Sequence, residues 1–327
     1  MKTLVGLVIS LLLVVSSCST KQSPMDITDS GLKRANFQTE IEGKATDLFV
    51  LKNRNGMEVC ITNFGGRIVS VMVPDREKKM RDVVLGFDSI QDYIEHPSDF
   101  GASIGRYANR INKGKFVLNG KEYRLPQNNF GHCLHGGPNG FQYRIFDADT
   151  IETQALVLSY LSKDGEEGFP GNLKCQVSFK LTDDNAIDIR YTAETDKPTI
   201  VNMTNHSYFN LDGDPSRSNA DYLLSINADY YTPVDSTFMT IGEVAKVEGT
   251  DMDFRTPTPV GQYINHYDFE QIKNGNGYDH NWVLNTKGDI NQKSAVLESP
   301  NTGIVLEVYT NEPGIQFYAG NFLDGSL

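Results

Sequence analysis

The residues best suited to acid–base chemistry lie in a segment that reads N-M-T-N-H-S-Y-F-N-L at 202–211. In an extended chain alternate side chains point to the same face, so His206 and Tyr208 would project into one pocket. A histidine titrates near neutral pH and can both give and take a proton. The residues alone leave open whether His206 is such a group or a core histidine bonded to a backbone carbonyl.

Four further segments are rich in glycine, asparagine and histidine and hold few lysines. They read G-A-S-I-G-R-Y-A-N-R-I at 101–111, H-C-L-H-G-G at 132–137, G-Y-D-H-N-W-V-L at 277–284 and T-N-E-P-G-I-Q-F-Y-A-G-N-F at 310–322. This mixture of fixed donors, acceptors and aromatic rings suits a sugar, because its hydroxyls need polar partners and its ring face packs on an aromatic side chain. The segments therefore predict a sugar site.

Arg106 and Arg110 have the same local setting in the first of these segments, and the residues alone favour neither. An arginine donates a planar fork that fits vicinal hydroxyls, and a carboxylate such as that of Asp279 can accept from two of them. His280 directly follows Asp279, so on a strand it would face away from Asp279. We predict a structural role for His280.

His132 and His135 have the H-x-x-H spacing that a metal site can use. No third ligand with suitable spacing accompanies them, and the two glycines after His135 fit a tight binding loop better. We therefore predict that the site holds no metal.

Hydrophobic periodicity predicts strands to position these segments. Apolar and polar residues alternate strictly over 173–181 and again over 187–193, and Asp183-Asp184-Asn185 supplies a turn between them. This pattern is typical of a hairpin with one solvated face. No helical stripe longer than two turns follows the N-terminal apolar run, so the economical fold is all-β, a large antiparallel β-sandwich. Similar short runs occur at 57–62, 68–73, 156–161, 223–226 and 303–309.

The N-terminus predicts export. Lys2 precedes an apolar run over 4–15 that ends in V-S-S-C at 15–18. The run is shorter than the ~20 residues that span a bilayer, and its charged start and small-residue end describe a signal peptide. The junction resembles a lipobox, which makes Cys18 the expected lipidation site; an ordinary signal peptide or an uncleaved anchor is the alternative.

The predicted organisation is therefore a signal peptide at 1–18, a polar tether at 19–35 and one β-sandwich domain at 36–327. The protein would be exported and lipid-anchored to a bacterial membrane, in the periplasm or on the cell surface.

Composition excludes some partners and frameworks. The 30 Lys+Arg and 42 Asp+Glu give a net charge of −12 without a basic run, so nucleic acid is not an expected partner. Of the four cysteines, lipidation of Cys18 would leave three, which cannot all pair in disulfides. Cys60 and Cys175 lie in apolar alternation and are predicted to be small core residues.

Together these segments resemble the aldose 1-epimerases, in which they occur in the same order with similar spacing, as do D-G-E-E-G-F-P-G-N-L at 164–173 and V-E-G-T-D-M-D-F-R at 247–255. The resemblance covers residues 42–327. It implies a galactose mutarotase-like supersandwich and the interconversion of α and β anomers of free aldoses such as galactose and glucose. The partner would be a monosaccharide, and no cofactor would be needed.

The resemblance also implies roles for individual residues. His206 falls on the general acid, which protonates the ring oxygen while a base removes the proton of the anomeric hydroxyl. The family pattern favours Arg110 over Arg106. Tyr208 joins the expected sugar-binding residues because it shares a face with His206. The expected sugar-binding residues are Asn109, Arg110, His135, Tyr208, Asp279 and Glu312.

The family's base is a glutamate in an L-E-x-Q segment that follows N-F-L-D-G, whereas this chain ends in N-F-L-D-G-S-L at 321–327. No residue of the chain is assigned as the base, and Glu312 is no substitute for it. Without a base we expect turnover to fall by ~10²–10⁴-fold, and without the last strands we expect an unpaired sheet edge. A fragment and a true truncation both remain open.

Two other functions stay open. One is a carbohydrate-binding protein that keeps the sugar pocket without turnover. The other is an epimerase of sugar phosphates, which would need a cationic cluster that the sequence does not show.

Overall fold

The predicted hairpin forms the centre of one sheet. The computed structural model describes residues 27–323. In it, Leu181 pairs with Ile187 across the predicted turn, so the hairpin is confirmed. Side chains of the first hairpin strand alternate between buried and more exposed positions, as the period-two pattern requires. The antiparallel sheet contains, in order, β12 (Asp147–Ile151), β13 (Ala155–Ser162), β14 (Leu173–Leu181) and β15 (Ile187–Thr195).

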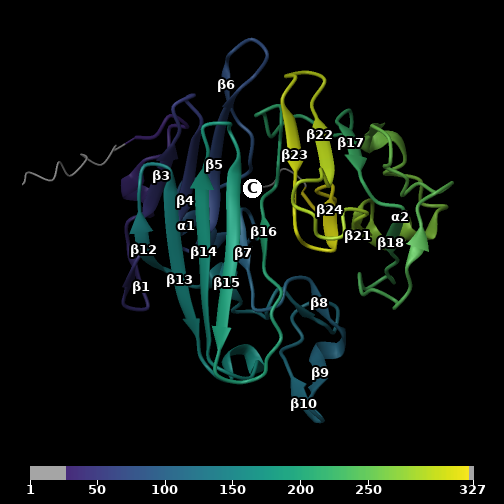
Figure 1. The fold of residues 1–327 in the computed structure, drawn as a ribbon, viewed down its shortest axis with the longest axis horizontal. Coiled ribbons are helices and arrows are strands. Elements are labelled where there is room, and N and C mark those ends of the chain that lie inside the picture. Colours follow the sequence, from purple (N-terminus) through teal and green to yellow (C-terminus); the bar gives the residue numbers. More distant parts are fainter. Residues whose placement is uncertain (1–26, 324–327) are drawn as a thin grey trace, which may run out of the picture.

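A second antiparallel sheet packs against the first. Its strands are, in order, β3 (Leu48–Lys52), β4 (Glu58–Thr62), β5 (Arg67–Pro74) and β6 (Met80–Asp82). All five residues of β4 are buried. Val59 and Ile61 of β4 share one apolar core with Leu158 and Val177 of the first sheet, so the two sheets form a sandwich (Figure 1).

The C-terminal half contributes two more four-stranded sheets. One contains, in order, β20 (Thr258–Pro259), β17 (Leu223–Ile226), β22 (Ala295–Glu298) and β23 (Val305–Val308). The other contains, in order, β19 (Ala245–Lys246), β18 (Tyr230–Thr232), β21 (Asp279–Val283) and β24 (Gly314–Tyr318). Phe254, Tyr278 and Trp282 are buried in the same continuous core as the first two sheets. The strands β15 and β23 lie at the edges of their sheets.

Pairs of short strands lie outside the four-stranded sheets, and β16 runs between the two halves (Figure 1). The antiparallel pairs are β16 (Thr204–His206) with β7 (Ala102–Ile104), β8 (Arg110–Ile111) with β11 (Cys133–Leu134), β9 (Lys115–Leu118) with β10 (Lys121–Arg124), and β1 (Glu40–Ile41) with β2 (Lys44–Ala45).

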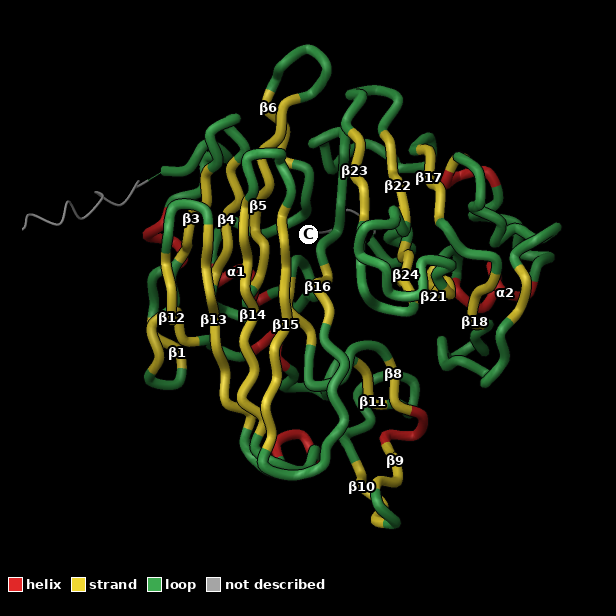
Figure 2. The backbone as a smooth tube through the Cα atoms, viewed as in Figure 1, coloured by secondary structure: helices red, strands yellow, loops and turns green. Residues whose placement is uncertain are grey.

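Helices are short, and strands and loops dominate (Figure 2). The α-helices are α1 (Ile90–Glu95) and α2 (Glu270–Gly275). The 3₁₀ turns are η1 (Arg34–Phe37), η2 (Asn112–Gly114), η3 (Phe141–Tyr143), η4 (Glu166–Gly168) and η5 (Val260–Gln262). Among residues 27–323, no helix is long and apolar enough to cross a membrane.

The predicted boundary between tether and domain needs correction. Leu32 and Phe37 are buried in a core cluster with residues of the second sheet. The backbone N–H groups of Asp29 and Ser30 donate to the buried Glu58 carboxylate, at 2.9 and 3.3 Å. Residues 27–35 therefore belong to the folded body, because one buried leucine and these hydrogen bonds anchor an otherwise polar stretch. The predicted signal at 1–18, including Cys18, and the tether residues 19–26 lie outside the described residues.

The described cysteines are structural. Cys60, Cys133 and Cys175 are unpaired and buried, which confirms the core positions predicted for Cys60 and Cys175. Burial raises the pKa of Cys175 to about 12, so its thiol stays protonated and unreactive at neutral pH.

Candidate active site

His206 lies at the last position of β16, where it pairs with Ala102 of β7. Its ring stacks on Tyr208, with ring centres 5.1 Å apart, which confirms that the two side chains share a face. Tyr208 in turn contacts the edges of Phe100 and Tyr318, at 4.8 and 5.7 Å. No hydrogen bond within residues 27–323 engages either ring nitrogen of His206. Aromatic packing therefore holds the imidazole while its nitrogens are left for a ligand.

His135 faces His206 across the site, and backbone geometry sets its tautomer. The two rings are perpendicular, with centres 5.1 Å apart. The backbone N–H of Asn109 donates to Nδ1 of His135 at 3.0 Å, and the backbone N–H of His135 returns a bond to the Asn109 carbonyl. Burial lowers the pKa of His135 to about 4, with smaller contributions from His206 and Arg110 and opposition from Asp99. The ring is neutral at pH 7, so its single hydrogen lies on Nε2.

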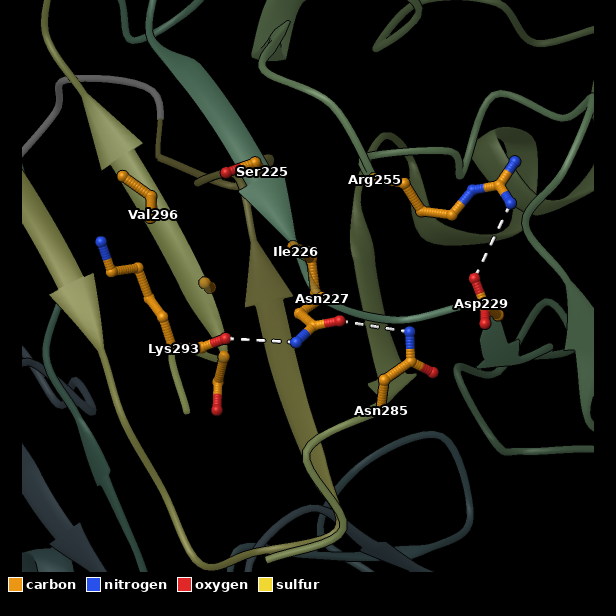
Figure 3. Close-up of a pocket in the computed structure, with 10 residues that line it drawn as sticks. Ser225, Ile226, Asn227, Asp229, Arg255, Asn285, Lys293 and Val296 are labelled. Carbon is orange, nitrogen blue, oxygen red and sulfur yellow. Dashed lines mark hydrogen bonds and ion pairs between the residues drawn. The ribbon is translucent and has the colours of Figure 1, made fainter. Parts of the chain in front are cut away.

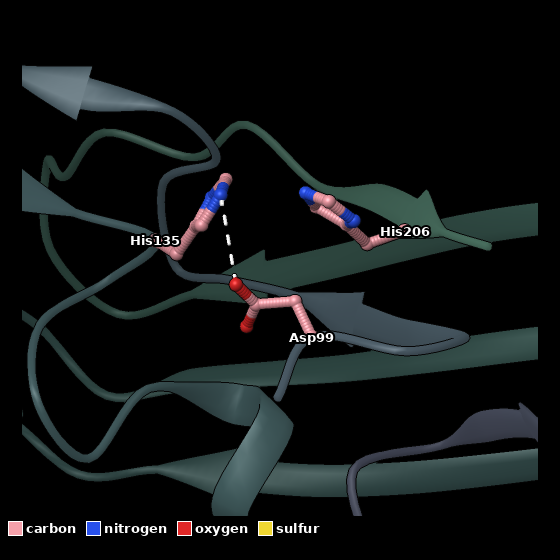
Figure 4. Close-up of side chains that lie close together, drawn as sticks. All are labelled: Asp99, His135 and His206. Atoms are coloured by element: carbon pink, nitrogen blue, oxygen red, sulfur yellow. Dashed lines mark ion pairs between the residues drawn. The ribbon is translucent and has the colours of Figure 1, made fainter. Parts of the chain in front are cut away.

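Asp99 completes this group at the end of a loop between α1 and β7. Its carboxylate Oδ2 lies 4.0 Å from Nε2 of His135. One ligand atom each of Asp99, His135 and His206 lie within 4.8 Å of one another (Figure 4). One carboxylate and two imidazoles therefore border the same small space.

Arg110 supplies the cation. Its Nε and Nη2 donate to the side-chain oxygen of Asn129, at 3.1 and 2.9 Å, and its Nη1 lies 3.4 Å from Oδ1 of Asn109. The guanidinium carbon lies 5.0 Å from the ring centre of Phe238. Stacking on an aromatic ring and the two bonds to Asn129 fix the plane of the fork before any ligand binds.

Arg106, which the residues alone did not distinguish from Arg110, is part of the core. Only 2% of it is exposed. Its guanidinium donates to the Ser162 side chain and to the backbone carbonyls of Ser162, Lys163 and Pro170. Arg106 holds loops together and has no free donor face, so Arg110 is the arginine that remains a candidate for the site.

Asp279 reaches the site from the other half of the molecule, at the first position of β21. The side-chain amide of Gln316 donates to Oδ1 of Asp279 at 2.8 Å and accepts from Nδ2 of Asn109 at 3.4 Å. Burial raises the pKa of Asp279, while the bond from Gln316 and the charges of Arg110 and His206 oppose that shift. Gln316 thus links the carboxylate of one half to the asparagine of the other.

Strand alternation explains why His280 is not part of the group. Asp279 pairs with Tyr318 in β24, and both turn to the site, whereas His280 and Trp282 face the core and are fully buried. Burial lowers the pKa of His280 to about 4. The predicted structural position of His280 is confirmed.

Glu312 is not brought together with the other predicted residues. It lies in the exposed turn before β24, where its backbone N–H donates to the Thr310 hydroxyl. Gly314, the first residue of β24, pairs with Val283, at the opposite end of β21 from Asp279. A strand rises about 3.3 Å per residue, so the length of β21 separates Glu312 from the carboxylate of Asp279.

Comparison with known proteins shows the family to which this chain belongs. A family model described as aldose 1-epimerase matches residues 47–327. The chain belongs to the aldose 1-epimerase family. It is an epimerase, an enzyme of the isomerase class, and its sandwich is the galactose mutarotase-like fold.

Relatives and solved structures agree with this assignment. A galactose mutarotase of Sus scrofa is 42% identical over 271 residues, which cover 83% of this chain and 77% of that protein. An aldose 1-epimerase of Escherichia coli (strain K12) is 38% identical over 286 residues, covering 87% of this chain and 82% of that protein. The structure of galactose 1-epimerase from Lactobacillus acidophilus NCFM superposes with a TM-score of 0.77 at 31% identity, covering 88% of this chain and 82% of that chain.

The ligand atoms of Asp99, His135 and His206 lie close enough together to suggest a metal site, but the hydrogen bonding of His135 does not suit a metal. A metal ion at Nε2 of His135 would need that nitrogen without its hydrogen, while Nδ1 already accepts from Asn109. The ring would have to become an imidazolate or give up the backbone bond. The group therefore fits sugar hydroxyls better than an ion, and the absence of a metal stays a prediction.

His132 does not join His135 in spite of the H-x-x-H spacing. Its Nδ1 accepts from the backbone N–H of Lys113, and its Nε2 lies 3.0 Å from the Thr237 hydroxyl. Both ring nitrogens are thus used to tie two loops together.

A cavity of about 320 Å³ is lined by none of these residues and lies where β17 ends and β22 begins (Figure 3). Its cations already have partners: Arg255 pairs with Asp253 at 2.8 Å and Asp229 at 3.7 Å, and Lys293 pairs with Glu307 at 2.5 Å. Because these cations are already paired, the cavity is a poor site for an anion. The candidate active site is therefore the group that contains His135 and His206.

Two residues of this candidate site were not predicted from the sequence. Gln316 lies in the segment 310–322, two residues before Tyr318 and therefore on the same strand face. This spacing is a signal that could have found it. Asp99 precedes the segment 101–111 and has no local pattern that distinguishes it from other loop acids.

Proposed function

We propose that this epimerase interconverts the α and β anomers of a free aldose, galactose or glucose, by opening and reclosing the sugar ring. The observation that carries the proposal is the unbonded imidazole of His206 within a group of fixed hydroxyl partners, namely Arg110, His135 and Asp279. Relatives named galactose mutarotase support the choice of sugar.

In this mechanism His206 acts as the general acid. It protonates the ring oxygen while a general base takes the proton of the anomeric hydroxyl, and the ring opens. Rotation about C1–C2 presents the other face of the carbonyl, and closure reverses both proton transfers. The Nε2–H of His135 and the fork of Arg110 donate to hydroxyls, and Asp279 accepts from them. These contacts keep the sugar in place while the anomeric carbon turns.

The proposal assigns the base to none of the residues 27–323. The family resemblance places it on a glutamate of an L-E-x-Q segment, and the described part of the chain holds no such segment. Asp279 accepts from Gln316 and lies in the field of the Arg110 charge, which suits a binding carboxylate.

Polarimetry tests this function directly. Freshly dissolved α-D-galactose should reach its equilibrium rotation faster with a chain extended to family length than with the same amount of that protein after heat denaturation. Binding of galactose without acceleration would instead favour the carbohydrate-binding alternative. Acceleration for a sugar phosphate but not for galactose or glucose would contradict the proposed substrate class.

We also propose that the epimerase is exported and attached to a bacterial membrane through a lipid on Cys18. The V-S-S-C junction at 15–18 and the polar residues that follow it support this proposal. Cells that express the protein should incorporate a radioactive fatty acid into it, and the Cys18→Ala variant should lose the label. An unlabelled parent protein that fractionates like Cys18→Ala would exclude the anchor.

A further inference from the structure

The loop that carries Asp99 is held in place by hydrogen bonds from a buried arginine, Arg67. Nη1 of Arg67 donates to the carbonyls of Ser98 and Phe100, both at 3.0 Å, and Nη2 donates to the carbonyl of Gln142 at 2.7 Å. Arg67 is fully buried. Because the carbonyls on both sides of Asp99 are bound, the backbone position of Asp99 is fixed, and its carboxylate lies toward His135 and His206 (Figure 4).

This carboxylate has no strong partner within residues 27–323. Its side chain is 25% exposed, and the one charged partner recorded for it among the described residues is Nε2 of His135, at 4.0 Å. That distance is too long for a hydrogen bond. A partly exposed acceptor with no hydrogen bond to another described residue is available to a ligand at the edge of the candidate site.

Asp99 and His135 together match a single hydroxyl group. His135 carries its hydrogen on Nε2, so a donor faces an acceptor across the 4.0 Å gap. One oxygen at about 2.8 Å from each atom fits this gap, because a hydroxyl accepts one hydrogen bond and donates another. The neighbouring His206, whose ring is 5.1 Å from that of His135, places this hydroxyl beside the proposed acid.

We propose that Asp99 is a specificity-determining residue that binds one hydroxyl of the aldose jointly with His135. This inference rests on the proposed function, since it requires an aldose in the site. It also specifies the substrate class further: a hydroxyl at this position is bound, a hydrogen is not, and an anionic substituent is repelled by the carboxylate.

The test combines Asp99→Ala and Asp99→Asn with the four monodeoxy sugars that lack the 2-, 3-, 4- or 6-hydroxyl of galactose. Dissociation constants are measured by isothermal titration calorimetry, and thermal unfolding checks each fold. Asp99→Ala should weaken galactose binding about 10–100-fold, the usual effect of losing a charged hydrogen bond. One deoxy sugar should bind Asp99→Ala as well as it binds the parent, because the hydroxyl that Asp99 recognises is already gone.

A matched control comes from the same stretch of chain. Asp88 is exposed before α1, so Asp88→Asn removes one negative charge outside the site and should leave every dissociation constant unchanged. Asp99→Asn, which keeps the size of the side chain and one acceptor oxygen, should show the same selective pattern more weakly even if Asp99→Ala folds poorly.

Failure of the role proposed for Asp99 and failure of the proposed function would give different results. If the parent binds galactose but all four deoxy sugars lose the same factor in both Asp99 variants, Asp99 recognises no particular hydroxyl and the inference is wrong while the proposed function stands. Unchanged galactose binding in both variants would have the same meaning. A parent that binds neither galactose nor glucose would overturn the proposed function and this inference with it.

Discussion

In a chain extended to family length, replacing His206 with glutamine should lower kcat for anomer interconversion by about 10²–10⁴-fold, the usual contribution of a general acid or base. Glutamine can occupy similar space beside Tyr208 but cannot deliver a proton near neutral pH. KM should change only a few-fold, because the lost interaction acts mainly in the transition state. The measurement is polarimetry over a range of galactose concentrations, with the spontaneous rate subtracted.

His96→Gln is the matched control for this substitution. His96 is exposed after α1 and lies outside the group around His206, so its replacement should leave kcat at the parental value. Calorimetry should show that His206→Gln still binds galactose with nearly parental affinity. A His206→Gln enzyme with parental kcat would remove His206 from the mechanism.

Replacing Arg110 with methionine should raise the dissociation constant for galactose by about 10–100-fold, since hydrogen bonds from a charged group contribute about 1.5–3 kcal/mol. The fork is already oriented by Asn129 and Phe238, so the parent loses little entropy when the sugar binds. Loss of the Arg110 charge should also raise the pKa of Asp279 further, because that charge opposes the effect of burial. Sugar binding by the variant should therefore weaken at a higher pH than in the parent as the solution is acidified.

Replacing Arg110 and Arg106 separately with methionine should affect the stability of the protein differently. Arg110 is partly exposed, so Arg110→Met should keep a free energy of unfolding close to that of the parent. Arg106→Met should instead lower the free energy of unfolding by several kcal/mol, because each buried acceptor left unpaired costs about 1–3 kcal/mol. Urea denaturation measures both. Equal loss of stability in the two variants would show that Arg110 is structural, and parental galactose binding by a folded Arg110→Met would exclude it from the site.

Much of the fold follows from local patterns in the chain. Strict alternation over 173–181 and 187–193 predicts two strands because side chains of a strand alternate between core and solvent, and β14 and β15 lie there. The same rule places Asp279 and His280 on opposite faces of β21. Local pattern failed at residues 27–35, whose polar composition predicts a tether although Leu32 is buried. Composition does not show that a single side chain will find a core cluster.

The sequence by itself determined the strand pattern, the segments that carry polar and aromatic groups, and through their order the family. Tertiary structure decided which of these groups meet. It buried Arg106 in the core but left Arg110 partly exposed. It also placed Glu312 before the first residue of β24, at the end of the strand that lies far from Asp279. It also joined Asn109 to Gln316 across 207 residues of chain, and Asp99 to His135 and His206. Such contacts depend on how distant loops are held, by Arg67 under Asp99 for example, and no local spacing encodes that support.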